Sequence, residues 1–236
     1  VVAVGWWLEN RPNEQVFPAY TNVDERVDET GTVHRWVAFG GGPVPSNNQI
    51  AIEADLMEAR EVLGGRAPVL FSGGSQARCV QVLAPRPEED GVRRELAALF
   101  WPRAGRDATY RRPRIEDALP ATRSNVLAVM ERQLGLATDV PLLVYVSGHG
   151  ELASRRTDNA VQLWAGGRIT PVDLAELFER IEPQRMTRLV MTTCYSGAFA
   201  DVIFNTGDAR TGRLRTNRCG FFAAPWDLES SGCDPD

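Results

Sequence analysis

Two stretches decide the fold: PLLVYVSGHGE at residues 141–151 and TRLVMTTCYSGAF at residues 187–199. Each begins with a run of β-forming residues and ends in small residues around one reactive side chain, His149 in the first and Cys194 in the second. The apolar runs do not alternate with polar residues, which is typical of strands buried on both faces of a parallel sheet. The two stretches therefore predict parallel strands, each with a reactive side chain at its carboxyl end.

The segment before them predicts how the sheet begins. Residues 34–39 have the pattern of a strand that runs into three glycines, and residues 50–63 place apolar side chains at helical spacing before Gly64. Residues 67–71 then form the next strand. Strand, glycine turn, helix and strand make a βαβ unit, in which the two strands are parallel.

Further elements complete an α/β pattern. Thr170 is expected to cap a helix as its N-cap residue, with Pro171 at the first position and Asp173 at the third. The remaining predicted elements are helices at residues 122–134 and 174–181 and a fifth strand at residues 219–224. The fold class is therefore α/β, with a mostly parallel central sheet and helices on both faces.

Composition excludes several classes of protein. The chain has 236 residues, 43% of them hydrophobic and 24% charged, with a net charge of −5, as in ordinary globular proteins. All 26 basic residues are Arg, but they are scattered over an acidic chain, which does not favour binding to nucleic acid. No apolar run is long enough to span a bilayer. We therefore expect no nucleic-acid or membrane partner.

The domain organisation is predicted as an N-terminal extension at residues 1–31 and one folded domain at residues 32–236. Residues 72–120 are interpreted as a surface insertion that contains a helix at residues 91–101. The sequence ends at Asp234-Pro235-Asp236, and we expect the C-terminal part of the domain to be missing or cleaved off.

The four cysteines are too sparse for a disulfide scaffold, and no CxxC pair points to zinc. Cys219 and Cys233 either pair with each other, which implies export to an oxidising compartment, or are ordinary thiols. A free reactive thiol fits a cytoplasmic protein. No metal or cofactor site is expected from the sequence.

His149 and Cys194 are the candidate catalytic residues. The carboxyl edge of an open parallel sheet is where ligands bind, so two strands would bring this imidazole and this thiol together as a nucleophile and its base. The alternative is a hydrogen-bonded structural histidine and a buried thiol. The other histidine, His34, precedes a strand and is expected to be structural.

These motifs resemble the caspase-like cysteine peptidases, the group of caspases, metacaspases, legumains and gingipains. Cys194 follows His149 by 45 residues, against about 50 in caspases. The stretch AAPWDLESSGC at residues 223–233 looks most like legumain, as do Pro45-Ser46-Asn47 and Glu53-Ala54-Asp55. The resemblance implies a caspase-like three-layer sandwich and a thiol protease that hydrolyses protein substrates, made as a zymogen and self-processed.

The resemblance also assigns roles to residues. Cys194 would be the nucleophile and His149 the acid and base. The backbone N–H groups of Gly150 and Cys194 would form an oxyanion hole. Asn47 would support the histidine, with Asn48 as the next candidate. Thr192, Ser230 and Ser231 would line the substrate pocket.

Two departures leave substrate preference open. Legumain has an acidic residue at the place of Thr192 and an Arg-His pair at the place of Ala51 and Ile52. Specificity for Asn is therefore not implied, and the Ser and Thr walls suit a small or polar side chain. The expected partners are a protein or peptide substrate and either the cleaved C-terminal fragment or a regulatory protein. The alternatives are a catalytically silent protein-interaction domain of the same fold and a hydrolase of other esters or amides.

Overall fold

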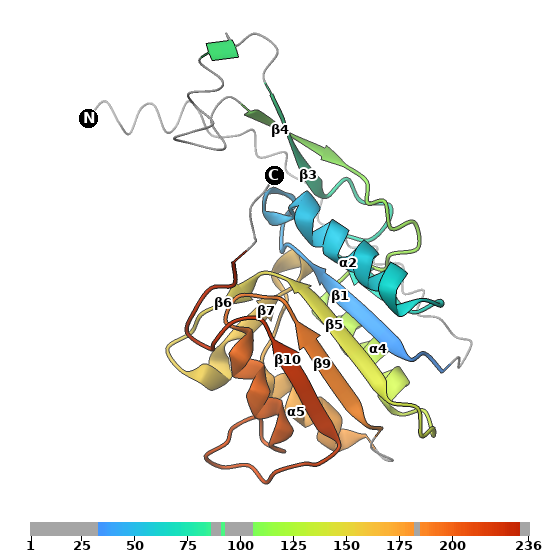
Figure 1. Cartoon of the computed structure of the whole chain (residues 1–236), viewed down its shortest axis with the longest axis vertical. Helices are drawn as coiled ribbons and strands as arrows, with labels where there is room; N and C mark the ends of the chain where they lie inside the picture. Colours follow the sequence, from blue (N-terminus) through green and yellow to red (C-terminus); the bar gives the residue numbers. More distant parts are fainter. Residues whose placement is uncertain (1–32, 86–90, 93–105, 182–184, 232–236) are drawn as a thin grey trace.

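The computed structural model describes residues 33–85, 91–92, 106–181 and 185–231 (Figure 1). The predicted N-terminal extension, most of the predicted helix at residues 91–101, and the chain end with Cys233 lie outside the described residues.

The centre of the fold is a five-stranded sheet in the order β10-β9-β5-β1-β2, in which every neighbouring pair is parallel. This confirms the parallel sheet and the βαβ unit expected from the sequence. The five strands are β1 (Trp36–Gly41), β2 (Val69–Phe71), β5 (Leu142–Gly148), β9 (Thr187–Met191) and β10 (Arg218–Phe222).

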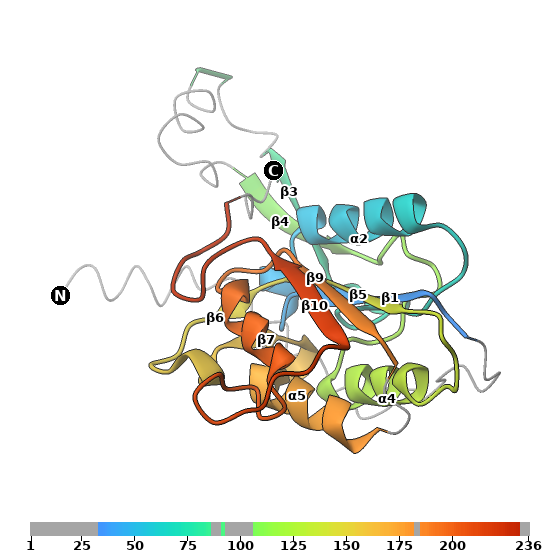
Figure 2. The same cartoon turned by 60° about the horizontal axis from the view of Figure 1, so that its bottom comes forward.

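Helices cover both faces of this sheet (Figure 2). The helix α2 (Ile50–Leu63) lies on one face, and α4 (Arg123–Leu134) and α5 (Pro171–Arg180) lie on the other. In β1, Val37 and Phe39 belong to the core beneath α4 and α5, whereas Trp36 and Ala38 belong to the core beneath α2. Apolar side chains on both sides of one strand explain why its sequence does not alternate.

The helix ends follow their local sequence. Thr170 and Asp173 form the predicted capping box of α5, with the Thr170 side chain accepting from the Asp173 N–H and the Asp173 carboxylate accepting from the Thr170 N–H. Thr122 caps α4 by accepting from the N–H of Asn125. The helix α2 ends at Gly64, whose φ of 64° is in the left-handed region that glycine adopts easily.

Strand limits differ slightly from those expected. The strand β1 starts at Trp36 because the backbone of His34 is bound instead by the side chains of Gln133 and Arg185. The strand β10 ends at Phe222, and the carbonyl of Ala224 accepts a hydrogen bond from Gly197. The chain after β10 therefore turns toward the loop that carries Cys194.

The block at residues 72–120 is only partly the surface insertion that we expected. It contains the antiparallel strands β3 (Val80–Pro85) and β4 (Arg106–Arg111). Its two ends are buried in the core beneath α2, with Cys79, Val80, Ile115 and Ala118 among the core residues. The expectation was wrong for these ends, because the chain must return along β2 to reach α4 and packs apolar side chains on the way.

Smaller elements, which the sequence pattern did not predict, lie around the carboxyl edge of the sheet. Three short strands form another small sheet, in addition to the β3-β4 pair: β6 (Gly150–Glu151), β7 (Ala160–Gln162) and β8 (Arg168–Ile169). The 3-10 helices are η1 (Pro45–Asn47), η2 (Arg156–Asp158), η3 (Trp164–Gly166) and η4 (Ser196–Ile203). None of the helices in the described ranges is long and apolar enough to cross a membrane.

Candidate active site

The candidate site lies where the connections of the sheet change direction. From β1 the chain passes to β2 on one side, and the later strands β5, β9 and β10 follow on the other side. Ligands of open α/β sheets bind in the crevice at the carboxyl ends of the strands beside such a switch point. Asn47 follows β1, His149 follows β5 and Cys194 follows β9, so three predicted residues meet this edge.

His149 is held by the loop after β1. Its Nε2 lies 2.6 Å from the backbone oxygen of Asn47 and 3.0 Å from Oε1 of Gln49. A carbonyl oxygen only accepts hydrogen bonds, so Nε2 carries the proton, and in the neutral ring the lone pair is on Nδ1. The loop therefore fixes the tautomer in which Nδ1 can take a proton.

The residues of this loop contribute differently from what the resemblance suggested. Asn47 contacts His149 through its main chain, while its side chain accepts a hydrogen bond from Ser46. Asn48 is fully buried and ties the loop to the backbones of Gly42 and Cys79. Asn48 therefore shapes the loop and does not contact the imidazole through its side chain.

Gln49 is a site residue that sequence reasoning missed. It is the residue before α2, and its side chain reaches His149 from there. The sequence did offer one indication of this role, because Gln49 lies two residues after Asn47 in a loop already assigned to the site. A second acceptor beside the first restrains the imidazole in the same orientation.

Cys194 lies at the bend between β9 and η4. The following residue, Tyr195, has a φ of 58°, which is strained for a residue other than glycine and turns the chain sharply after the cysteine. Cys194 is half-buried, and its sulfur accepts a hydrogen bond from the backbone N–H of Ser230 at 3.3 Å. An N–H directed at the sulfur stabilises negative charge there.

The segment at residues 224–231 runs along the Cys194 loop and fixes it. The N–H of Tyr195 donates to Leu228 O at 2.9 Å, and the Tyr195 hydroxyl binds the Glu229 carboxylate at 2.9 Å. Cys194, the predicted nucleophile, and Ser230, a predicted pocket residue, are therefore neighbours in the structure.

The loops that carry His149 and Cys194 are in close contact. A Cβ atom added to Gly150 would lie 1.9 Å from the Cys194 carbonyl oxygen and 2.7 Å from its carbonyl carbon. The backbone oxygen of His149 also accepts from Gln162 of β7 at 2.9 Å, so the small sheet holds this loop in place. Residue 150 has to be glycine because any side chain would collide with the Cys194 backbone.

A cavity of about 330 Å³ adjoins the two loops. It includes all three residues predicted to bind substrate, and its lining residues are Gln49, Ala51, Ile52, Asp55, Ser147, Gly148, Thr192, Ala223, Ser230 and Ser231. The Thr192 hydroxyl donates to the Val146 carbonyl at 3.3 Å, which orients this part of the wall. The volume of the cavity is at the lower end of the range for small-ligand sites.

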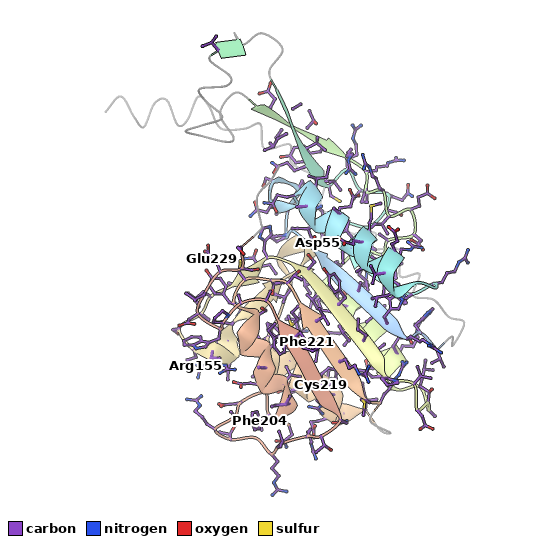
Figure 3. The ribbon with its side chains drawn as sticks, viewed as in Figure 1. Asp55, Arg155, Phe204, Cys219, Phe221 and Glu229 are labelled. Carbon is purple, nitrogen blue, oxygen red and sulfur yellow. The ribbon has the colours of Figure 1, made fainter. Side chains whose placement is uncertain are left out.

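The other cysteines differ from Cys194 in their surroundings. Burial raises the pKa of the Cys79 thiol to about 11, so this thiol stays protonated at neutral pH. Cys219 is a free, exposed thiol on β10, and its suggested partner Cys233 lies outside the described residues (Figure 3). Within the described ranges, no three His, Cys, Asp or Glu side chains come together as metal ligands.

Comparison with models of known protein families gives no match, and a search of curated proteins finds none that matches either. The function therefore has to be inferred from the chemistry of the site.

Proposed function

We propose that the chain is a cysteine endopeptidase that hydrolyses peptide bonds in protein substrates, with Cys194 as nucleophile and His149 as acid and base. The observation that carries the proposal is the pair of acceptors on His149 Nε2, which leaves Nδ1 as the basic nitrogen beside the loop of a half-buried cysteine.

The chemistry follows from the two side chains. His149 Nδ1 takes the thiol proton, and the Cys194 sulfur attacks the peptide carbonyl carbon. The tetrahedral intermediate collapses as the imidazolium gives its proton to the leaving amine, which leaves a thioester on Cys194. Water, deprotonated by His149, then hydrolyses the thioester and restores the thiol. The N–H groups of Gly150 and Cys194 are the proposed donors to the oxyanion.

The same features support membership of the caspase-like peptidases, closest to legumain. A parallel sheet with helices on both faces, a His-Gly pair after one strand and a Cys after the next are what this group would require. The proposed partners are a protein or peptide substrate and either the cleaved C-terminal fragment or a regulatory protein.

The test is covalent labelling with a peptide chloromethyl ketone, followed by mass spectrometry of the digested protein. We expect label on Cys194 in the wild type and its loss in His149→Ala. The exposed Cys219 is the internal control, because its slow labelling should be equal in both proteins. Equal labelling of Cys194 with and without His149, or no labelling in a folded wild type, would favour a silent interaction domain.

A further inference from the structure

We propose that Arg156 is a positioning residue of the site: it ties the chain that follows His149 to the turn that carries Cys194. This inference rests on the proposed peptidase function and adds one residue to the same site. Arg156 does not line the cavity beside Cys194. It would therefore act on the geometry of the nucleophile and not on the binding of substrate.

Arg156 belongs to the segment that follows His149. This segment runs through β6, η2 and β7, and Arg156 is the first residue of η2. The strands β6 and β7 pair with each other, and the N–H of Gln162 in β7 donates to the His149 backbone oxygen at 2.9 Å. The segment is therefore a loop whose two ends meet beside His149, with Arg156 near its middle.

The guanidinium of Arg156 reaches η4, the helix that follows Cys194. Its Nη2 donates to the backbone oxygen of Gly197 at 2.9 Å and lies 3.1 Å from Oδ1 of Asp201. Gly197 comes three residues after Cys194, and Asp201 lies in the next turn of η4. One nitrogen on the His149 side of the site is thus bound at two points on the Cys194 side.

A second side chain of the same loop makes a similar link. Asn159 is fully buried; its Nδ2 donates to the backbone oxygen of Trp226 at 2.6 Å, and its Oδ1 accepts from the N–H of Ala153 at 2.9 Å. Trp226 belongs to the segment at residues 224–231, which binds the Cys194 sulfur. The loop therefore contacts both segments that hold the cysteine.

The turn that Arg156 contacts is strained. Tyr195 has a φ of 58°, a conformation that costs free energy for a residue other than glycine and persists where surrounding contacts enforce it. The N–H of Gly197 donates to Ala224 on the other side at 2.8 Å, while its carbonyl accepts from Arg156. Loss of Arg156 would free one side of this turn, and the displacement would reach Cys194.

Asp201 holds the guanidinium in place. Burial raises the pKa of the Asp201 carboxyl, and the charge of Arg156 opposes this rise. A buried carboxylate needs a paired cation, so the two side chains stay together. The preceding Arg155, labelled in Figure 3, is largely exposed and pairs instead with Asp158 at 2.7 Å. Two successive arginines therefore have separate partners, which makes Arg155 a suitable control.

The experiment makes two measurements on the full chain. Alkylation by a peptide chloromethyl ketone at increasing concentrations gives the maximal rate at Cys194 and the concentration for half of that rate. Hydrogen exchange with mass spectrometry follows the amides of residues 195–198. We expect Arg156→Gln to lower the maximal rate about 10-fold and to leave the half-saturating concentration unchanged, because the cavity stays intact. Amide exchange should become about 10-fold faster.

Two variants serve as references, and thermal denaturation checks that each is folded. Arg155→Gln removes the same charge from the neighbouring position and should keep the wild-type values. Arg156→Lys should restore part of the rate, to about 3-fold below the wild type. Both contacts come from one nitrogen, and the lysine ammonium has three donors but a side chain one bond shorter.

The two measurements separate the two proposals. If the ketone does not label Cys194 in the folded wild type, the peptidase proposal fails, while exchange at residues 195–198 still shows whether Arg156 holds the turn. A maximal rate or an exchange rate equal to that of the wild type in folded Arg156→Gln would overturn the role of Arg156. So would a change in the half-saturating concentration alone. If Arg156→Gln does not fold, Arg156→Lys decides, and wild-type values in that variant would overturn the role.

Discussion

Replacing Gly150 by alanine tests the contact between the two loops of the site. The new Cβ would lie 1.9 Å from the Cys194 carbonyl oxygen, and ordinary contact begins at 3.4 Å. The backbones must therefore separate by about 1.5 Å, which is the difference between these two distances. The movement displaces Cys194 relative to His149, because the colliding oxygen belongs to Cys194, the proposed nucleophile.

A misplacement of about 1 Å at a reacting group can lower a rate about 100-fold. We therefore expect Gly150→Ala to reduce kcat/KM, or the rate of Cys194 alkylation, by about 100-fold. The cost in the free energy of unfolding should be smaller, about 1–3 kcal/mol, as for other overpacked sites. The loss of reactivity would then come from the displaced Cys194 and not from unfolding of the protein.

The assay measures the rate of Cys194 alkylation by mass spectrometry, together with circular dichroism and thermal denaturation of each variant. Gly135→Ala is the matched control: it makes the same replacement at the end of α4, where φ is −76° and the nearest atom is 3.2 Å away. If the Gly150→Ala variant keeps both the fold and the wild-type rate of Cys194 alkylation, the inferred close contact between the two loops is refuted.

Three further predictions concern residues outside the site. Burial raises the pKa of Cys79 to about 11. Iodoacetamide at pH 8 should therefore label the exposed Cys219 and leave Cys79 unmodified until the protein is denatured. Labelling of both cysteines at equal rates would contradict this prediction. Arg185 is buried and donates hydrogen bonds to three backbone carbonyls. Arg185→Met should therefore lower the free energy of unfolding, measured by urea titration, by about 3 kcal/mol. A urea midpoint equal to that of the wild type would show that the carbonyls find other donors. Burial alone would raise the pKa of Asp173, but hydrogen bonds from Thr170 and an arginine hold it below its usual value. A carboxylate whose pKa is lowered in the folded state stabilises the fold above its unfolded pKa of about 3.9, and it loses this effect as the pH falls through the folded pKa. Asp173→Asn should therefore lower the free energy of unfolding by about 1 kcal/mol at pH 7 and by progressively less below pH 4.

Local sequence was enough to predict the central strands, the main helices and part of the site. The capping box of Thr170 and Asp173 fixes a helix start because its hydrogen bonds join residues only three positions apart. Apolar runs without alternation require strands covered on both faces, which leads to a parallel sheet. Because parallel strands end at the same edge, the order of elements alone predicted that His149 and Cys194 lie at one edge of the sheet.

The tertiary structure decided which other residues reach that edge. Gln49 and Asp55 belong to a helix and its start, and helical periodicity predicts which face of a helix is apolar but not which loop or cavity lies opposite each polar residue. Asn47 acts through its carbonyl oxygen, a group that every residue has and that no sequence pattern distinguishes. These contacts depend on how α2 packs across β1 and β5, and that packing comes from apolar burial, which is not directional.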